Sequence, residues 1–334
     1  MQRGYADSIG IPAKLGLDFE LIPFTSIPYQ PLARGDIDWL YSCQFCYTKT
    51  LEEFPSYRTP LITNHYKGFV VIGRTGDLTY EQALADNNGD KEAALEDLAE
   101  WVRGKEIPRP EGDSTAPIQI FLDSLGLTLD DIEIPRPADR QSLANAFIRG
   151  EYDLYLGNLP NQSRMLYSAE LEDQFVIVAP LELFGGRALW YSTEGTTQEY
   201  IDCCYESLLR TVAVWYRAAR YLDEMPEIVA EYVAEAAIAA TGGENLGTLT
   251  TSDLLTELNH HFTLEAAADF LYDPDAPTYF GIPGESAFSA FPDLDWRTFE
   301  VEDKIFADLM AREDLVAFIN GPLGSGIGPN GDDS

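Results

Sequence analysis

The chain has 334 residues, 45% of them hydrophobic, which is enough apolar material for the cores of two ordinary domains. Its 56 acidic residues outnumber 22 basic ones, and the formal net charge of −34 repels phosphate backbones and anionic lipids, which argues against nucleic-acid partners. This acidic surface suits a high-salt environment and equally an ordinary exported protein. No apolar stretch approaches the roughly 20 residues that cross a bilayer. No apolar signal region follows Met1, so we expect either a removed export signal or a cytoplasmic chain.

An internal repeat organises the first half of the chain. Residues 15–39 and 125–154 share one pattern of helix, turn, strand and second helix, followed by another strand. The second helix of each copy is followed by a glycine, Gly35 or Gly150, which suits the position after a helix end because glycine adopts positive φ without a Cβ clash. Two such copies predict two α/β lobes of similar build.

The remaining elements follow from apolar runs and helical spacing. The short apolar runs at 39–41 and 154–156 predict parallel strands that are covered on both faces. In chain order, the other predicted elements are strands at 19–24 and 68–73, helical sequence at 80–102, a strand at 105–110, a helix at 116–125, strands at 131–134 and 175–179, and long helices at 205–224 and 227–240.

Four segments carry a resemblance to a known family: Ala6–Leu21, Leu32–Asp38, Arg103–Ile107 leading into Gly112–Thr115, and Arg149–Asp153. With the order of elements, they resemble the type II periplasmic solute-binding proteins of ABC importers. The most similar group is the one for nitrate, sulfonate and taurine, and thiamine-pyrimidine precursors. The resemblance extends over roughly the first two thirds of the chain, and its motifs are matches of spacing.

The resemblance implies an α/β fold with two lobes, each a mainly parallel sheet flanked by helices. Lobe 1 then comprises residues 1–71 and 187–334, and lobe 2 is inserted as residues 72–186, with hinges near 72 and 186. The family begins with a strand, whereas this chain begins with a predicted helix. We therefore expect the first strand to be missing.

The resemblance also implies a function. The implied protein captures a small organic ligand, anionic or aromatic, in the cleft between the lobes. It is a monomer that works in the periplasm or at the cell surface. The implied partners are the membrane subunits of an ABC importer, and neither catalysis nor a cofactor is implied. One alternative is an enzyme that resembles the thiamine-pyrimidine synthases, for which Cys203, Cys204 and His65 are the nearest functional residues. Another is a ligand-sensing domain that signals to a partner.

Ligands of open α/β sheets bind beyond the carboxyl ends of the strands, and this rule selects the candidate binding residues. In the first lobe they are Ser42, Cys43, Gln44 and Phe45, and in the second lobe Asn158 and Asn161. A predicted helix N-terminus adds free N–H groups and two hydroxyls that suit an anion, or form an ordinary helix cap. Its residues are Gly112, Asp113, Ser114 and Thr115.

Aromatic residues near strand ends and lobe junctions form a further candidate set, because aromatic rings can enclose a flat ligand or an alkylammonium group. We select Tyr5, Phe45, Trp190 and Tyr191. Arg74, near the expected hinge, either pairs an anionic ligand or forms a surface salt bridge.

The cysteines and histidines predict no metal site. Cys43 and Cys46 have the spacing of redox and zinc sites, but no second chelating pair accompanies them, so we expect a disulfide or two small buried residues. His260 and His261 are adjacent in a predicted helix, where their side chains point about 100° apart and cannot readily share an ion. No catalytic triad or phosphate-binding motif is recognisable.

Overall fold

A computed structural model gives the structure of the chain. It describes residues 6–22, 27–66, 70–109, 116–156, 159–168, 170–171, 173–180, 189–229, 232, 259–288, 291 and 293–324. The chain divides into two compact units: unit 1 comprises Met1–Tyr66 and Trp190–Ser334, and unit 2 comprises Lys67–Leu189. The chain therefore passes between the units at 66/67 and 189/190, within six residues of the two hinge positions that the sequence suggests.

Unit 1 contains a four-stranded sheet in the order β1-β6-β2-β7. The strands are β1 (Leu40–Cys43), β6 (Tyr191–Thr197), β2 (Tyr57–Tyr66) and β7 (Asn259–His261). All three ladders are antiparallel. Because β6 and β2 are rich in Thr and Tyr, they suit a pleated surface, and both are buried along nearly their whole length.

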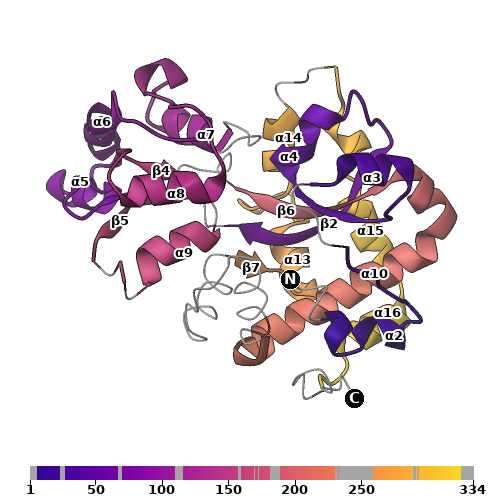
Figure 1. The fold of residues 1–334 in the computed structure, drawn as a ribbon. Coiled ribbons are helices and arrows are strands. Elements are labelled where there is room, and N and C mark those ends of the chain that lie inside the picture. The colour runs from indigo at the N-terminus through magenta and orange to yellow at the C-terminus, as the bar shows by residue number, and fades with distance from the viewer. Residues whose placement is uncertain are drawn as a thin grey trace. The chain divides into compact units, whose positions relative to one another are not determined.

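The helices of unit 1 lie around this sheet (Figure 1). They are α2 (Ile11–Lys14), α3 (Tyr29–Arg34), α4 (Gln44–Tyr47), η1 (Thr48–Thr50), α10 (Gln198–Glu224), α13 (Leu264–Phe270), α14 (Gly281–Phe288), η5 (Trp296–Thr298), α15 (Glu302–Met310) and α16 (Glu313–Asn320). One apolar cluster joins α2 to the second half of α10 and includes Ile11, Val214 and Tyr221. The C-terminal helices α15 and α16 also pack on α10.

Helix α10 begins earlier than its apolar spacing indicates. The predicted helix starts at residue 205, because the buried apolar positions begin at Leu208. In the structure, the Thr197 side chain accepts a hydrogen bond from the backbone N–H of Tyr200 at 3.0 Å and caps a helix that starts at Gln198. The added turns include Cys204, whose φ of −132° is not helical and which forms a disulfide with Cys203.

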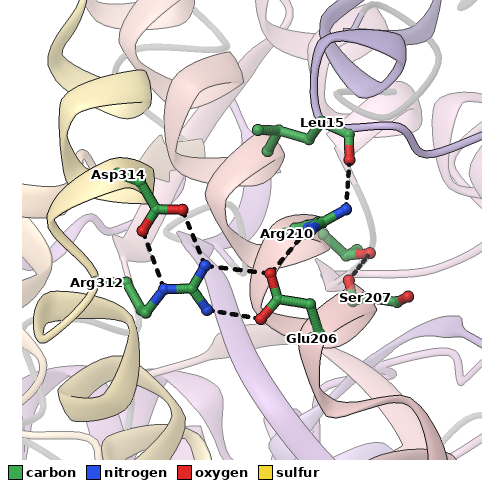
Figure 2. A network of polar contacts seen from close by, with 7 residues as sticks. Leu15, Glu206, Ser207, Arg210, Arg312 and Asp314 are labelled. Carbon is green, nitrogen blue, oxygen red and sulfur yellow. Dashed lines mark hydrogen bonds and ion pairs between the residues drawn. The ribbon is translucent and has the colours of Figure 1, made fainter.

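A polar network joins three segments of unit 1 on its surface (Figure 2). The Arg312 guanidinium donates to both carboxylate oxygens of Glu206, at 2.6 and 3.1 Å, and to both oxygens of Asp314, at 2.9 Å each. Arg210 donates to Glu206 at 3.0 Å and to the carbonyl oxygen of Leu15 at 3.1 Å. The network therefore connects the end of α2, the side of α10 and the start of α16.

Unit 2 contains a three-stranded antiparallel sheet in the order β4-β3-β5. Its strands are β3 (Val70–Arg74), β4 (Tyr155–Leu156) and β5 (Phe175–Pro180), and its helices are α5 (Tyr80–Asp86), α6 (Lys91–Val102), α7 (Ala116–Ser124), η2 (Leu129–Asp131), α8 (Arg140–Ile148) and α9 (Leu159–Tyr167). The core lies around Phe147, which is fully buried and stacks on Tyr155 with ring centroids 5.6 Å apart. Unit 2 thus has a conventional apolar core, which its strands and helices form together.

Several expectations are confirmed. The fold class is α/β. Of the two repeat glycines, Gly35 directly follows α3 and has φ 75°, and Gly150 follows α8 after Arg149 and has φ 86°. The predicted helices at 116–125 and 205–224 and the predicted strands at 68–73 and 175–179 are present. The predicted helix at 227–240 falls mostly outside the described residues.

The direction of the described strands differs from the expected mainly parallel sheets. Every ladder between named strands is antiparallel, and only the isolated bridges Thr59–Glu300 and Glu106–Glu133 are parallel. The expectation came from the continuous apolar runs, which indicate a strand covered on both faces. Burial on both faces does not fix direction, because β3 is buried on both faces and still pairs antiparallel.

Three local predictions are wrong. His260 lies in strand β7 and not in a helix, since it pairs with His65 of β2. Residues 19–22 form no strand, and within 105–109 and 131–134 the only β-pairing is the bridge between Glu106 and Glu133. For His260 the partner strand is remote in sequence, so local propensity could not decide its structure. Among the described helices, none combines the length and the apolar character needed to cross a membrane.

Candidate functional site in unit 1

Three segments of unit 1 meet where the chain leaves for unit 2 and returns from it. They are the end of β1 with the start of α4, the end of β2, and the start of β6, and we call residues 42–46, 64–66 and 190–193 the edge site. The ladder register places Cys43 opposite Ser192, and Ser192 opposite Asn64. Residues that are paired in this way share one face of the sheet. Candidate residues that lie about 150 positions apart in the sequence therefore lie together.

An aromatic stack forms the apolar part of the edge site. Phe45 and Trp190 have ring centroids 4.7 Å apart and planes inclined by 21°. Tyr191 lies beside them in the strand, where it is fully buried, packs edge-on against His65 at 5.3 Å and donates its hydroxyl to the carbonyl oxygen of Thr278. Offset stacking of this kind stabilises both rings by about 0.5–1.5 kcal/mol beyond their area burial.

The C-x-x-C motif forms a disulfide at the same place. Cys43 and Cys46 are bonded to each other and enclose Gln44 and Phe45 within a ring of four residues. This ring holds the turn from β1 into α4 in one conformation, because the cross-link removes alternative backbone geometries from the segment. Of the two alternatives that the sequence leaves open, the structure has the disulfide. It fixes the position from which Phe45 stacks on Trp190.

Two of the predicted ligand residues in this segment point into the core of unit 1. Ser42 is 2% exposed, and its hydroxyl is 2.7 Å from that of Tyr29. Gln44 is fully buried, and its side-chain amide donates to Glu300 at 3.0 Å and to the carbonyl oxygen of Phe280 at 3.3 Å. Ser42 lies in β1 and points to the face opposite that of Cys43, because successive side chains of a strand alternate, whereas Gln44 is the first residue of α4.

A row of polar side chains continues the edge site along the sheet. Asn64 donates to the hydroxyl of Ser192 at 3.2 Å, and Thr63 donates to Asn64 at 2.8 Å. The ring of Tyr41 is half exposed, but its hydroxyl lies among Asn64, Ser192 and Glu194. Desolvation there raises the pKa of Tyr41 to about 12.

The sequence interpretation missed this row. The sequence feature that could have indicated this row is the segment 191–197, which is rich in Ser and Thr. In the structure this segment is buried along nearly its whole length. A buried polar side chain needs a hydrogen-bond partner, so such a run indicates partners on neighbouring strands.

The edge site contains no permanent positive charge. Residues 40–46, 64–66 and 190–194 include no Lys or Arg. His261, which pairs with Asn64 in the β2–β7 ladder, is partly buried, and desolvation lowers its pKa to about 3, so its imidazole is neutral at pH 7. The site therefore consists of aromatic and neutral hydrogen-bonding side chains, and its residues Asn64, Trp190 and Ser192 are at most 7% exposed.

The candidates of unit 2 have local roles. The Arg74 guanidinium donates to the carbonyl oxygen of Phe147 and lies 5.1 Å from the centre of its ring, so it packs on the core of that unit. Asn161 is 7% exposed and donates to the carbonyl oxygen of Arg140 at 3.4 Å. The remaining candidates lie outside the described residues: Tyr5, Gly112, Asp113, Ser114, Thr115 and Asn158.

No group of three or more His, Cys, Asp or Glu side chains suited to a metal ion occurs in the part of the chain that the structure describes. Cys203 and Cys204, the pair named for the enzyme alternative, are bonded to each other within α10. His65 lies on β2 and packs against Tyr191.

Comparison with solved structures identifies the fold. The chain is similar to a sulfonate-binding protein of a sulfonate ABC transporter from Methylobacillus flagellatus, with a TM-score of 0.60, 15% identity, and coverage of 94% of this chain and 90% of that one. It is also similar to the periplasmic aliphatic sulphonate-binding protein of Escherichia coli, with a TM-score of 0.58, 12% identity, and coverage of 91% and 88%. No protein-family model matches the chain, and no curated protein matches it.

A third similar structure comes from a fungus. It is a Candida albicans protein described as showing the generic periplasmic-binding-protein fold, with a TM-score of 0.54, 8% identity, and coverage of 93% of this chain and 90% of that one. The three similarities extend over almost the whole chain. At such low sequence identities they show the fold and do not show the function. The chain has the periplasmic-binding-protein fold.

Proposed function

We propose that this protein is an extracytoplasmic solute-binding protein that captures a small organic ligand for an ABC importer. The observation that carries the proposal is the edge site, where the Phe45–Trp190 stack and the Cys43–Cys46 disulfide lie at strand ends on the periplasmic-binding-protein fold. In open α/β sheets, ligands bind beyond the carboxyl ends of strands, and the Cys43–Cys46 turn with Phe45 lies at the carboxyl end of β1. The chain binds its ligand as a monomer, and the membrane subunits of the importer are its protein partners.

The edge site supports an aromatic ligand more directly than an anionic one. Its rings match a flat group, and its neutral polar row matches hydrogen-bonding substituents at the rim of that group. The segments of the edge site supply no Lys or Arg to pair an anion. A carboxylate or sulfonate on the ligand would therefore be bound from residues outside the edge site, for which the segment 112–115 remains our proposal.

The disulfides support the proposed location. Both cysteine pairs in the chain are bonded, Cys43 to Cys46 and Cys203 to Cys204. Disulfides persist in the periplasm and at cell surfaces and are rare in the reducing cytosol of mesophiles. We propose that the protein works in the periplasm or at the cell surface.

A ligand panel tests the proposal. Thermal-shift measurements with aromatic carboxylates, sulfonates, pyrimidines and flavins should find compounds that raise the melting temperature, because a ligand of the folded state stabilises it by mass action. Replacing Phe45 with Ala should weaken binding of the best compound by about tenfold, the effect of losing roughly 1.4 kcal/mol of contact. Phe270→Ala is the matched control, because this ring is 50% exposed and lies outside the edge site. Equal affinity in both variants would remove the edge site from the proposal.

A further inference from the structure

Two glutamates are buried beneath α4, outside the row that the edge site uses. Glu300 is 1% exposed and Glu302 is fully buried, and they lie two residues apart at the start of α15. Ionised carboxylates are expensive to bury unless hydrogen bonds or opposite charges compensate them. The surroundings of the two groups therefore decide what state each of them is in.

Glu300 is placed to carry negative charge. The Tyr47 hydroxyl donates to its Oε1 at 2.6 Å, and the Gln44 amide donates to its Oε2 at 3.0 Å. Gly284 approaches so closely that a Cβ there would lie 2.6 Å from Oε2, which keeps other side chains away. With a donor on each oxygen, Glu300 is the first of the two to ionise.

Glu302 has the opposite environment. Neither of its carboxylate oxygens has a hydrogen-bond partner from another residue within the described structure, and only its own backbone N–H lies close. A carboxylate there would be desolvated and would also face the charge of Glu300. A neutral carboxyl group removes the larger part of that cost, because it carries no net charge.

The neighbouring groups supply Glu302 with no net positive charge. The tyrosines that face Glu302 are Tyr47 from α4, Tyr216 from α10, Tyr272 after α13, and Tyr279 before α14, and burial raises the pKa of all four, so they are neutral. The nearby cation is Arg297 of η5, which is ion-paired with Asp303 at 2.9 Å. At Glu302 the charge of Asp303 raises the pKa more than the charge of Arg297 lowers it.

We propose that Glu302 is a buried proton-binding site, and that it stays protonated in the folded protein at neutral pH while Glu300 ionises first. The pKa values agree in direction. Burial raises the pKa of Glu300 to about 8, against the lowering effect of its two donors. Burial raises the pKa of Glu302 well above its usual value, and the charge of Glu300 raises it further. The pair therefore holds at least one proton at a pH where ordinary glutamates hold none.

Because of this site, the folded state of unit 1 gains stability as the pH falls. The folded state binds the proton more tightly than the unfolded chain, so its contribution to stability is complete below the ordinary glutamate pKa and is lost as the pH rises through the folded pKa. The proposal concerns the ligand-free protein and holds whether or not the proposed ligand exists.

Infrared spectroscopy tests the proposal directly, since protonated and ionised carboxyl groups absorb at separate frequencies. At about pH 7 the protein should show the band of protonated carboxyl groups, and Glu302→Gln should lose the part of it that Glu302 contributes, because ordinary carboxyls with pKa values near 4 are ionised there and only Glu300 is still partly protonated. Glu313→Gln is the matched control, since Glu313 lies exposed in the first turn of α16, and it should leave the band unchanged. An unchanged band in Glu302→Gln would overturn the proposal.

A second variant separates the site from a mere folding effect. In Glu300→Gln the neighbouring charge is absent, so the remaining protonated-carboxyl band should disappear at a lower pH than the Glu302 band does in the unchanged protein. Circular dichroism of each variant at the same pH checks that it is folded. If the band of Glu300→Gln disappears at the same pH as in the unchanged protein, Glu300 does not act on Glu302 and the proposal fails.

Discussion

The two sheets of this protein solve burial in different ways. Strands β3 and β5 of unit 2 are built from apolar residues, Val70–Ile72 and Phe175–Ala179, and cover the Phe147 core. Strands β2 and β6 of unit 1 are as deeply buried but carry Thr63, Asn64 and Glu194. Thr63 and Asn64 are stabilised there by hydrogen bonds to each other and to Ser192 of the neighbouring strand. Polar burial of this kind marks the unit that holds the candidate site.

The largest expected effect concerns the apolar core of unit 2. Phe147→Ala should lower the free energy of unfolding of unit 2 by about 3–5 kcal/mol, because it removes a fully buried ring that contacts Tyr155, Phe175 and Arg74 and leaves a cavity. Urea denaturation measures it. Tyr167→Ala, at a ring that is 44% exposed, is the control and should change stability by less than about 0.5 kcal/mol. Comparable losses in both variants would show that unit 2 does not depend on this core.

The next effect breaks a polar contact inside unit 1. Arg217 is 3% exposed and donates to the carbonyl oxygens of Phe318 and Pro322, each at 2.6 Å, so it satisfies the end of α16. Arg217→Ala should destabilise the protein by about 2–3 kcal/mol, because it leaves buried carbonyl groups without donors. Arg217→Lys should recover only part of this, since one ammonium cannot replace the guanidinium fork. Full recovery by Lys would show that charge alone matters at this position.

The third prediction concerns the pH dependence of the stability of unit 1. The stability of unit 1 should fall as the pH rises from about 4.5 toward about 8, the interval between the ordinary and the raised pKa of Glu300. Glu302→Gln should raise stability at about pH 8 by roughly 1–2 kcal/mol and flatten the decline, because it removes a group that must stay neutral. Thermal unfolding between these pH values measures both effects. An equal decline in the variant would contradict this account.

The smallest effect concerns the surface network of Figure 2. Arg312→Ala removes a guanidinium that is 34% exposed and bonded to Glu206 and Asp314, and should lower the stability only slightly at low salt. The cost should shrink at about 1 M salt, where charges are screened over about 3 Å. Chemical denaturation at both salt concentrations decides the matter, and a larger cost at high salt would show that packing and not charge holds this contact.

The same contrast explains what the sequence could predict. Elements with local signals were predictable: the apolar run of β3, the apolar spacing of α10, and the glycine after α3. Pairings over long separations were not, and His260 is the clearest case, because only its register with His65 makes its segment a strand. The difference arises because strand formation depends on a partner strand, whereas helix formation depends on neighbours in sequence.

The candidate site divides in the same way. The strand-end rule selected Cys43 and Phe45 from the sequence, the search for aromatic residues added Trp190, and the structure brings the three together. Neither approach could find Asn64 or Ser192, because their hydrogen bond joins strands more than a hundred residues apart. The inward direction of Gln44 depends on Glu300, which is still more distant in the sequence.

Native mass spectrometry of the intact chain, after incubation with the compound that gives the largest thermal shift, tests the central claim most directly. The account predicts a complex of one compound per chain, with little complex for Phe45→Ala and full complex for Phe270→Ala at the same concentration. Absence of any complex throughout the panel, together with conversion of a compound into a product of different mass, would contradict capture as the function of this protein.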